Sequence, residues 1–294
     1  MRALWIADFT TADHIGGAEL TGAAIIEAAE DTEVVQIKTA MVNQHIAADD
    51  SFDVTIVDSM TQMSRPQDVR VILDKRPFFS IEFDYNKVSP TRHLLTPQDP
   101  FLKNEGDWGK WYREFWAHPN RKRSFFMSEE QRKIHREKIV ETGGDGGRFD
   151  ETTEVLSSIF SQDFWAFVDK LQSRPSRRPR EDYLIFDTQH PLKGKEQSVA
   201  FAEANKLTPV RLFSKLSPKQ LLREMSKSKG LVFLPTMHDS CPRMAIEALI
   251  LGCEIHINDL VQMKDEEWFQ TPEAAREYLE HRGTYFWDTI KQHI

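Results

Sequence analysis

Two carboxylates eight positions apart, Asp239 and Glu247, are the residues whose types and spacing best fit a binding or catalytic site. They lie in the stretch FLPTMHDSCPRMAIEALILGCEIHI, residues 233–257. Its pattern predicts a buried strand, a polar turn that holds Asp239, a helix that opens at Pro242 and holds Glu247, and a further strand. Carboxylates accept hydrogen bonds from hydroxyls, and a helix N-terminus favours anions. The stretch therefore predicts a ligand that is both polyhydroxylated and phosphorylated.

A second candidate is a glycine pair after the first predicted strand. Gly16 and Gly17, in the string GGAE, precede a helix predicted to begin near Ala18. Glycines at such a turn let backbone amides approach a phosphate at the positive end of the helix, although a purely structural turn is the alternative. A dinucleotide fingerprint needs three spaced glycines, and these two are adjacent, so a nicotinamide or flavin cofactor is not favoured.

The stretch with Asp239 and Glu247 resembles the acidic-x7-Glu signature of retaining nucleotide-sugar glycosyltransferases with the GT-B fold, especially glycosyltransferase family 4. The first acid is usually Glu in that family, and here it is Asp239. The resemblance implies that Glu247 binds the ribose hydroxyls of the nucleotide and that Asp239 contacts hydroxyls of the transferred sugar. It also implies that the backbone amides of Ser240 and Cys241 meet the donor diphosphate.

Two further motifs carry the same resemblance. GGAE matches the family's N-terminal glycine-rich motif, which implies that Gly16 and Gly17 face the donor diphosphate. Lys193 and Gly194 match a Lys-Gly pair just before a helix, which implies that Lys193 contacts the donor phosphates, where an ammonium stabilises charge growing on the leaving group. Many members also have an arginine upstream, whereas this chain reads FDTQHP there. Either Lys195 or a linker arginine substitutes, or the donor is handled differently.

Strand and helix patterns alternate along the chain, which predicts an α/β fold with parallel sheets. The predicted strands are 3–9, 34–39, 52–60, 77–85, 124–127, 182–188, 209–214, 231–235 and 254–258, and the predicted helices include 19–30, 66–75, 128–140, 196–205 and 218–229. The segment SRPSRRPRE, 173–181, is rich in proline and arginine without an apolar face, and we interpret it as a linker.

These elements and the resemblance together predict a GT-B arrangement of two Rossmann-like domains that face each other across a cleft. We expect an acceptor-side domain at 1–175 and a nucleotide-sugar donor domain at 176–270. As in GT-B enzymes, helices in 271–294 would cross back to the first domain. Thr271 followed by Pro272 predicts the N-terminus of the first of these helices.

Acceptor recognition is expected at the carboxyl ends of the first domain's strands, where open parallel sheets bind ligands. Asp8, Asp13 and His14 follow the first strand, and His14 is the catalytic candidate among them, although a lone histidine is more often structural. The segment from 80 to 94 adds Glu82, Asp84, Tyr85, Arg92 and His93.

Aromatic and basic clusters leave two interpretations open. The tryptophans Trp108, Trp111 and Trp116 could stack on a sugar or a base, or pack in the core. The basic clusters could be solvated faces or could bind a polyanionic acceptor such as modified DNA; they comprise Arg121, Lys122, Arg123, Arg174, Arg177, Arg178 and Arg180. The run TGGDGG, 142–147, is interpreted as a connector because no GKS or GKT follows it.

Composition bounds the remaining classes. The chain has 294 residues, 40% hydrophobic and 29% charged, which suits a globular protein of two domains. A net charge of -8 argues against broad nonspecific nucleic-acid binding, which needs many lysines and arginines. No apolar run approaches the roughly 18 residues of a membrane span, and the N-terminal run is not that of a signal peptide. Only Cys241 and Cys253 are present, and we expect reduced, partly buried thiols in a cytoplasmic protein.

The function predicted from these features is retaining, metal-independent transfer of a sugar from a nucleotide diphosphate donor to an acceptor hydroxyl. The donor is expected to be a UDP- or GDP-sugar used as co-substrate, with no other cofactor and no metal. The acceptor would be a glycan or a small molecule. Two alternatives remain: a glycosyltransferase that acts on hydroxymethylated DNA bases, and a noncatalytic nucleotide-sugar-binding subunit of a larger assembly.

Overall fold

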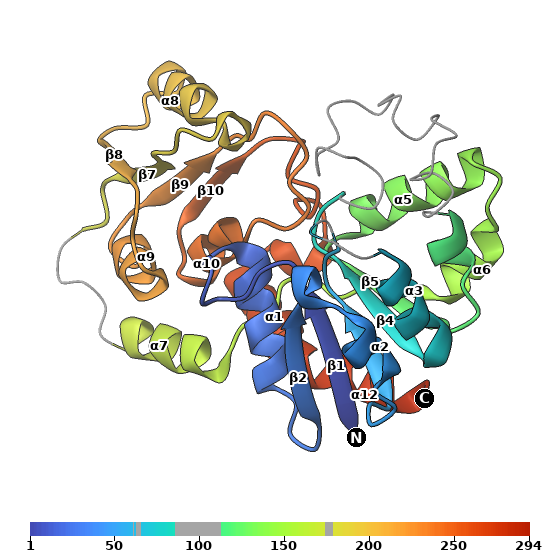
Figure 1. Cartoon of the computed structure of the whole chain (residues 1–294). Coiled ribbons are helices and arrows are strands. Elements are labelled where there is room, and N and C mark those ends of the chain that lie inside the picture. The colour runs from blue at the N-terminus through green and yellow to red at the C-terminus, as the bar shows by residue number, and fades with distance from the viewer. Residues whose placement is uncertain (61, 63–65, 86–112, 174–178) are drawn as a thin grey trace. The chain divides into compact units, whose positions relative to one another are not determined.

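The computed structural model describes residues 1–60, 62, 66–85, 113–173 and 179–294. The chain forms two compact units, and each is a parallel sheet with helices packed around it (Figure 1). The first unit comprises Met1–Ile159 and Arg282–Ile294, and the second comprises Phe160–His281.

The described part of the first unit contains a six-stranded sheet of order β2-β1-β3-β4-β5-β6. All its strand pairs are parallel. The strands are β1 Arg2–Ala7, β2 Glu33–Lys38, β3 Val54–Val57, β4 Phe78–Glu82, β5 Arg121–Phe126 and β6 Thr153–Val155. The helices are α1 Gly17–Glu27, α2 Gln44–Ala48, α3 Pro66–Lys75, α5 Glu129–Glu141, α6 Gly146–Glu151 and α12 Arg282–Gln292. β3 and β4 are buried along their whole length, because helices on both faces of a parallel sheet favour continuous apolar runs.

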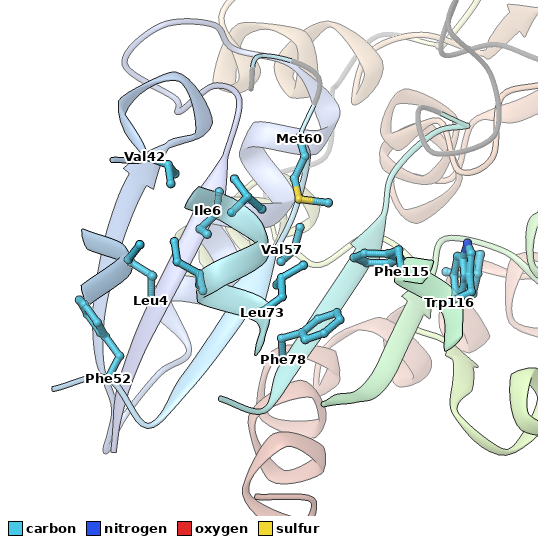
Figure 2. Packing of buried hydrophobic residues seen from close by; sticks show 14 of the residues in the cluster. Leu4, Ile6, Val42, Phe52, Val57, Met60, Leu73, Phe78, Phe115 and Trp116 are labelled. Carbon is cyan, nitrogen blue, oxygen red and sulfur yellow. The ribbon is translucent and has the colours of Figure 1, made fainter. Parts of the chain in front are cut away.

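Figure 2 shows the core on one face of this sheet, where side chains of β1, β3 and β4 meet those of α3. Trp116, from a short helical segment at 113–117, is 4% exposed and stacks on Phe126 with ring centroids 5.9 Å apart. Trp116 is therefore a core residue. Trp108 and Trp111 lie outside the described residues.

Helix α12 completes the first unit from the far end of the chain. Trp287 Nε1 donates a hydrogen bond of 2.7 Å to the backbone oxygen of Ile25 at the end of α1. Phe286 packs against Trp5 of β1 and Phe125 of β5, with centroid distances of 6.3 and 4.8 Å. The preceding helix, α11 Pro272–Leu279, packs on α10 in the second unit instead.

The second unit contains a four-stranded parallel sheet of order β10-β9-β7-β8 among its described residues. The strands are β7 Tyr183–Phe186, β8 Val210–Phe213, β9 Gly230–Phe233 and β10 Glu254–Ile257. The helices are α7 Gln162–Gln172, α8 Lys195–Ala204, α9 Pro218–Met225, α10 Arg243–Ile250 and α11. The predicted α/β class with two parallel, Rossmann-like units is confirmed. Thr271 caps α11 as predicted, since its side chain accepts from Ala274 N at 3.1 Å.

Helix α7 joins the second unit although the linker was predicted only after it. Its aromatic residues explain this, because the guanidinium carbon of Arg276 lies 5.4 Å from the ring centroid of Trp165. Phe160, just before α7, lies 4.0 Å from the guanidinium of Arg243 on α10. In the described part of the chain, no helix has both the length and the apolar content to cross a membrane.

Candidate functional site

The connection from β7 to α8 is held by a glycine that has no room for a side chain. Gly194 has φ +64° and ψ +39°, and an added Cβ would lie 1.7 Å from the backbone oxygen of Leu234. Two hydrogen bonds reinforce the contact: Leu234 N donates to Ser198 Oγ at 3.0 Å, and Thr236 N donates to Leu192 O at 3.1 Å. The residues before α8 are thereby fixed against the turn that follows β9.

This contact brings Lys193 to Asp239, 46 positions later in the chain. Lys193 Nζ lies 2.8 Å from Asp239 Oδ2, and the two side chains are 41% and 17% exposed. Lys193 Nζ also lies 5.9 Å from the ring centroid of Phe233 at the end of β9. The pair thus stands at the carboxyl edge of the second sheet and remains open to solvent.

The backbone around Asp239 is held by the segment that follows β10. Asp239 N donates to Leu260 O at 2.9 Å, and Gln262 N donates to Asp239 O at 3.0 Å. Ser240 and Cys241 come next and are buried, and Pro242 is the N-cap of α10. Cys241 Sγ lies 3.4 Å from Met263 Sδ in this buried setting. The thiol is thus a packing group, and what Ser240 and Cys241 offer is a backbone at the positive end of a helix.

Glu247 lies one turn along α10 from Arg243. Its Oε1 is 3.6 Å from Arg243 Nε, and the two side chains are only 8% and 9% exposed. Burial raises the pKa of Glu247 to about 7, and the charge of Arg243 opposes part of that rise. Burial also lowers the pKa of Arg243. The spacing of these residues, i and i+4 on a helix, was a usable signal in the sequence that pointed to Arg243.

The burial of Glu247 differs from what the helical pattern suggested. In the sequence, Met244, Ala248 and Leu251 fall on one helical stripe, which favours an environment for Glu247 different from the core, but every residue from Ala245 to Leu251 is buried. Helix α10 packs against α9, α11 and both neighbouring strands, β9 and β10, so it has no wide solvent face.

The two described basic groups that could replace the missing upstream arginine each have a partner in the protein. Lys195 Nζ is 2.5 Å from Asp187 Oδ1, just past the end of β7. Arg180 Nη1 donates a hydrogen bond of 2.8 Å to Leu251 O. Leu251 is the C-cap of α10, and a cation at a helix C-terminus is stabilising. The other linker arginines, Arg174, Arg177 and Arg178, lie outside the described residues.

In the first unit, the glycine turn after β1 is looser. Gly16 is the N-cap of α1 with φ −120°, and Gly17 is the first helical residue. A Cβ on Gly16 would lie 2.5 Å from Glu19 Oε2 and 3.0 Å from the ring of His14. His14 is exposed, and its backbone N donates a hydrogen bond of 3.1 Å to Thr10 O.

The other residues of this unit that are candidates for acceptor binding differ in how deeply they are buried. Asp8 and Glu82 are 3% and 1% exposed at the carboxyl ends of β1 and β4. Asp13 pairs with Lys38 at 2.5 Å, which lowers the pKa of its carboxyl. Tyr85 is a core residue that stacks on His135 at 5.3 Å. Arg92 and His93 lie outside the described residues.

Arg121, the first member of one predicted basic cluster, is not part of a solvated face. It is 2% exposed, and its guanidinium lies 4.9 Å from the ring centroid of Trp116. Arg123 is 3.6 Å from Glu154 Oε1, and both side chains are largely buried. The cluster therefore contributes much less surface charge than its sequence suggested.

The second unit thus places a lysine, an aspartate and a helix N-terminus at one edge of a parallel sheet, with a buried glutamate one turn further along the helix. A cation and a helix N-terminus suit a diphosphate, and carboxylates suit hydroxyls. Within the described ranges, no cluster of histidine, cysteine, aspartate and glutamate has the arrangement of a metal site.

Comparisons with known proteins place this chain by its fold. Protein-family models give no match, and curated proteins give no significant one. Among solved structures, Anabaena Alr3699/HepE in complex with UDP and glucose matches with a TM-score of 0.56 at 12% identity, over 99% of this chain and 100% of that one. HepE in complex with UDP-glucose also matches with a TM-score of 0.56, at 14% identity over 99% and 91% of the two chains. A glycosyltransferase from Rickettsia africae ESF-5 matches with a TM-score of 0.50 at 10% identity, over 97% and 88%. The chain shares the α/β fold of these proteins.

Proposed function

We propose that this protein is a GT-B glycosyltransferase, of the family 4 type, that moves a sugar from a nucleotide diphosphate to an acceptor hydroxyl. Transfer proceeds with retention and without a metal ion, and the acceptor is a glycan or a small molecule. The protein acts in the cytoplasm. The observation that carries the proposal is the pairing of Lys193 with Asp239 at the edge of the second sheet, beside the start of α10.

The Lys193–Asp239 pair suits a ligand that displaces it. A partly exposed ion pair contributes only about 0–1 kcal/mol, so a ligand can open it at little expense in free energy. A donor diphosphate then takes the ammonium of Lys193, and the released carboxylate of Asp239 accepts hydrogen bonds from the sugar hydroxyls. The ammonium and the backbone at Ser240 and Cys241 stabilise the charge that grows on the departing diphosphate.

Glu247 is the residue proposed to hold the ribose. A carboxylate accepts two hydrogen bonds from a vicinal diol, and such bonds favour its charged form. Since its pKa is about 7 without ligand, donor binding should release a proton below that pH and strengthen as pH rises toward 8. Arg243 holds the carboxylate in place from the same helix.

The nucleotide is proposed to be UDP. This proposal is supported by the HepE structures, which hold UDP or UDP-glucose and share the fold over nearly the whole chain. GDP-sugars are the competing donors to be tested beside it. In the first unit, Gly16 and Gly17 are proposed to approach the donor phosphates, and the exposed ring of His14 to act at the acceptor.

The test is donor hydrolysis and thermal stabilisation with UDP-glucose, UDP-N-acetylglucosamine and GDP-glucose. We expect one UDP-sugar to raise the melting temperature and to be hydrolysed slowly to UDP. Lys193→Met should lower the turnover by about 10²-fold, the size of effect seen when a transition-state charge loses a donor.

The matched control is Lys195→Met, which removes a neighbouring lysine that pairs with Asp187. This variant should stay within about threefold of the wild type. Equal losses in the two variants would show that Lys193 has no specific role. An absence of stabilisation by every donor would reject the donor site itself.

A further inference from the structure

A cavity of about 230 Å³ lies in the first unit. It is at the amino-terminal edge of the sheet, opposite the carboxyl ends that hold Asp8 and Glu82. Arg121 is the first residue of β5, and the loop 142–145 follows the end of α5, so the cavity adjoins the amino ends of the strands. This loop is part of the TGGDGG run, which the proposed function does not use. The cavity is thus separate from the residues proposed to bind the donor.

Three arginines line this cavity, and one aspartate accompanies them. Arg113, Arg121 and Arg148 come from three different elements, and Asp145 precedes α6. Asp145 Oδ1 accepts from Gly147 N at 2.9 Å and from Arg148 N at 3.1 Å, so this carboxylate serves as the cap of α6. With three positive side chains and one negative, the lining has a positive balance.

The two inner arginines are held in place by oxygen atoms of the protein. Arg121 donates to Trp116 O at 3.0 Å, to Ser124 Oγ at 3.1 Å and to Thr152 Oγ1 at 2.8 Å. Arg148 Nη2 donates to His118 O at 2.9 Å, and its Nε is buried without a hydrogen-bond partner among the described residues. This Nε is closed to solvent, so a ligand in the cavity would meet the Nη atoms of Arg148 rather than its Nε.

The rest of the lining consists of Thr142, Gly143, Gly144 and apolar side chains. Trp116, Ile139 and Phe149 form the apolar walls, and each is no more than 4% exposed. An apolar cavity of roughly 150 Å³ is large enough to hold benzene, so a cavity of this size accommodates a ring together with an attached anionic group. A bare inorganic ion would leave the apolar walls without a contact.

We propose that this cavity binds a small organic anion whose phosphate or carboxylate meets Arg148 and Arg113 and whose ring lies against Ile139 and Phe149. Guanidinium groups match the planar geometry of both kinds of anion. The site does not depend on the proposed glycosyltransferase activity, and its test measures binding alone.

The test uses phenyl phosphate and benzoate as probes, with phenol and inorganic phosphate as controls that carry only a ring or only an anion. Titration calorimetry with the full chain should show one saturable site for phenyl phosphate, benzoate or both. The better probe should bind at least tenfold more tightly than phenol or inorganic phosphate, and its identity tells a phosphate ligand from a carboxylate. The proposal would be overturned if neither probe showed saturable binding, or if the better probe bound no more tightly than phenol or inorganic phosphate.

Two variants locate the binding, and one controls for charge. Arg148→Met should weaken the better probe at least tenfold. Ala117→Trp fills the cavity from an exposed lining position while keeping all three arginines, and it should abolish binding. Arg223→Met, which removes an arginine in the second unit, should bind as the wild type does. Unchanged binding in folded Arg148→Met and Ala117→Trp proteins would overturn the proposal.

Discussion

Both units join a parallel strand to a helix through a glycine, but the two turns are held in different ways. Gly194, before α8, has positive φ and meets backbone atoms of Leu234 at once. Gly16, before α1, has an extended backbone, and its nearest neighbour is the carboxylate of Glu19 at the end of a flexible side chain. Backbone therefore limits the space around Gly194 in the second unit, whereas side chains that can move limit the space around Gly16 in the first unit.

The largest effect is expected from Gly194→Ala. The left-handed backbone disfavours alanine by about 1 kcal/mol, and the contact with Leu234 O adds an overpacking penalty of about 1–3 kcal/mol. We expect the second unit to lose about 3 kcal/mol of stability, measured as a lower urea midpoint, or to fail to fold.

Gly143→Ala is the matched control for backbone conformation. Gly143 also has positive φ, +83°, but an added Cβ would meet nothing within 4 Å. Its loss should be about 1 kcal/mol. If the two variants were equally destabilised, the close approach of Leu234 would not matter, and the contrast between the turns would be wrong.

A comparable effect is expected from Glu247→Gln, and it appears as a change in the pH dependence of stability. The pKa of Glu247 rises from 4.5 to about 7 on folding, so the folded state holds more protons than the unfolded state between these values. Stability therefore falls as pH rises from about 4.5 to 7, by up to about 3 kcal/mol in total. Glutamine removes this dependence. The difference in unfolding free energy between the two proteins should thus change by about 2–3 kcal/mol between pH 5 and pH 8.

Glu254→Gln is a control, because the contribution of Glu254 to stability depends on pH in the opposite direction. The hydrogen bond from Tyr183 lowers the pKa of this carboxyl, so its contribution is present above the unfolded value and is lost as pH falls. Glu254 is about half exposed, and its effect should be small. A wild-type profile that Glu247→Gln leaves unchanged would contradict the burial of Glu247.

A smaller effect on stability is expected from Asp239→Asn. Loss of a partly exposed ion pair should lower the unfolding free energy by less than about 1 kcal/mol. Under the proposed function, hydrolysis of the nucleotide sugar should nevertheless fall by at least tenfold. A large loss of stability with normal turnover would make Asp239 a structural residue.

The smallest effect is expected from Gly16→Ala in the first unit. Alanine is a poorer N-cap than glycine by about 0.5 kcal/mol, and Glu19 can swing away from the new methyl group. The melting temperature should therefore change little. If Gly16 approaches the donor phosphates, the KM for the nucleotide sugar should rise in this variant, and a strongly destabilised protein would contradict the looser turn.

Much of the fold was predictable because local signals agreed with burial. Helix α3 spans the predicted 66–75, and the Thr271–Pro272 signal marks the start of α11. The sequence did not predict β6, whose three residues are too few for an alternating pattern. It also did not predict α7. The residues that anchor Phe160 and Trp165 are Arg243 and Arg276, which lie about 80 to 110 positions further along the chain.

The candidate site was predictable in its residue types but not in its contacts. The distance between Lys193 and Asp239 depends on Gly194 meeting Leu234, which no local pattern encodes. The helical stripe misplaced Glu247 because a periodicity argument assumes one solvent face, whereas α10 has neighbours on nearly all sides. For His14 and the glycines of α1, the roles remain predictions.

The position of α12 has a consequence for synthesis on the ribosome. The first unit contains the earliest residues of the chain, but the helix that covers Trp5 and Phe125 comes from residues 282–292. All of the second unit must be translated in between, which at roughly 5–20 residues per second takes on the order of ten seconds. During that interval one aromatic face of the nascent first sheet lacks its cover, a surface of the kind that chaperones bind.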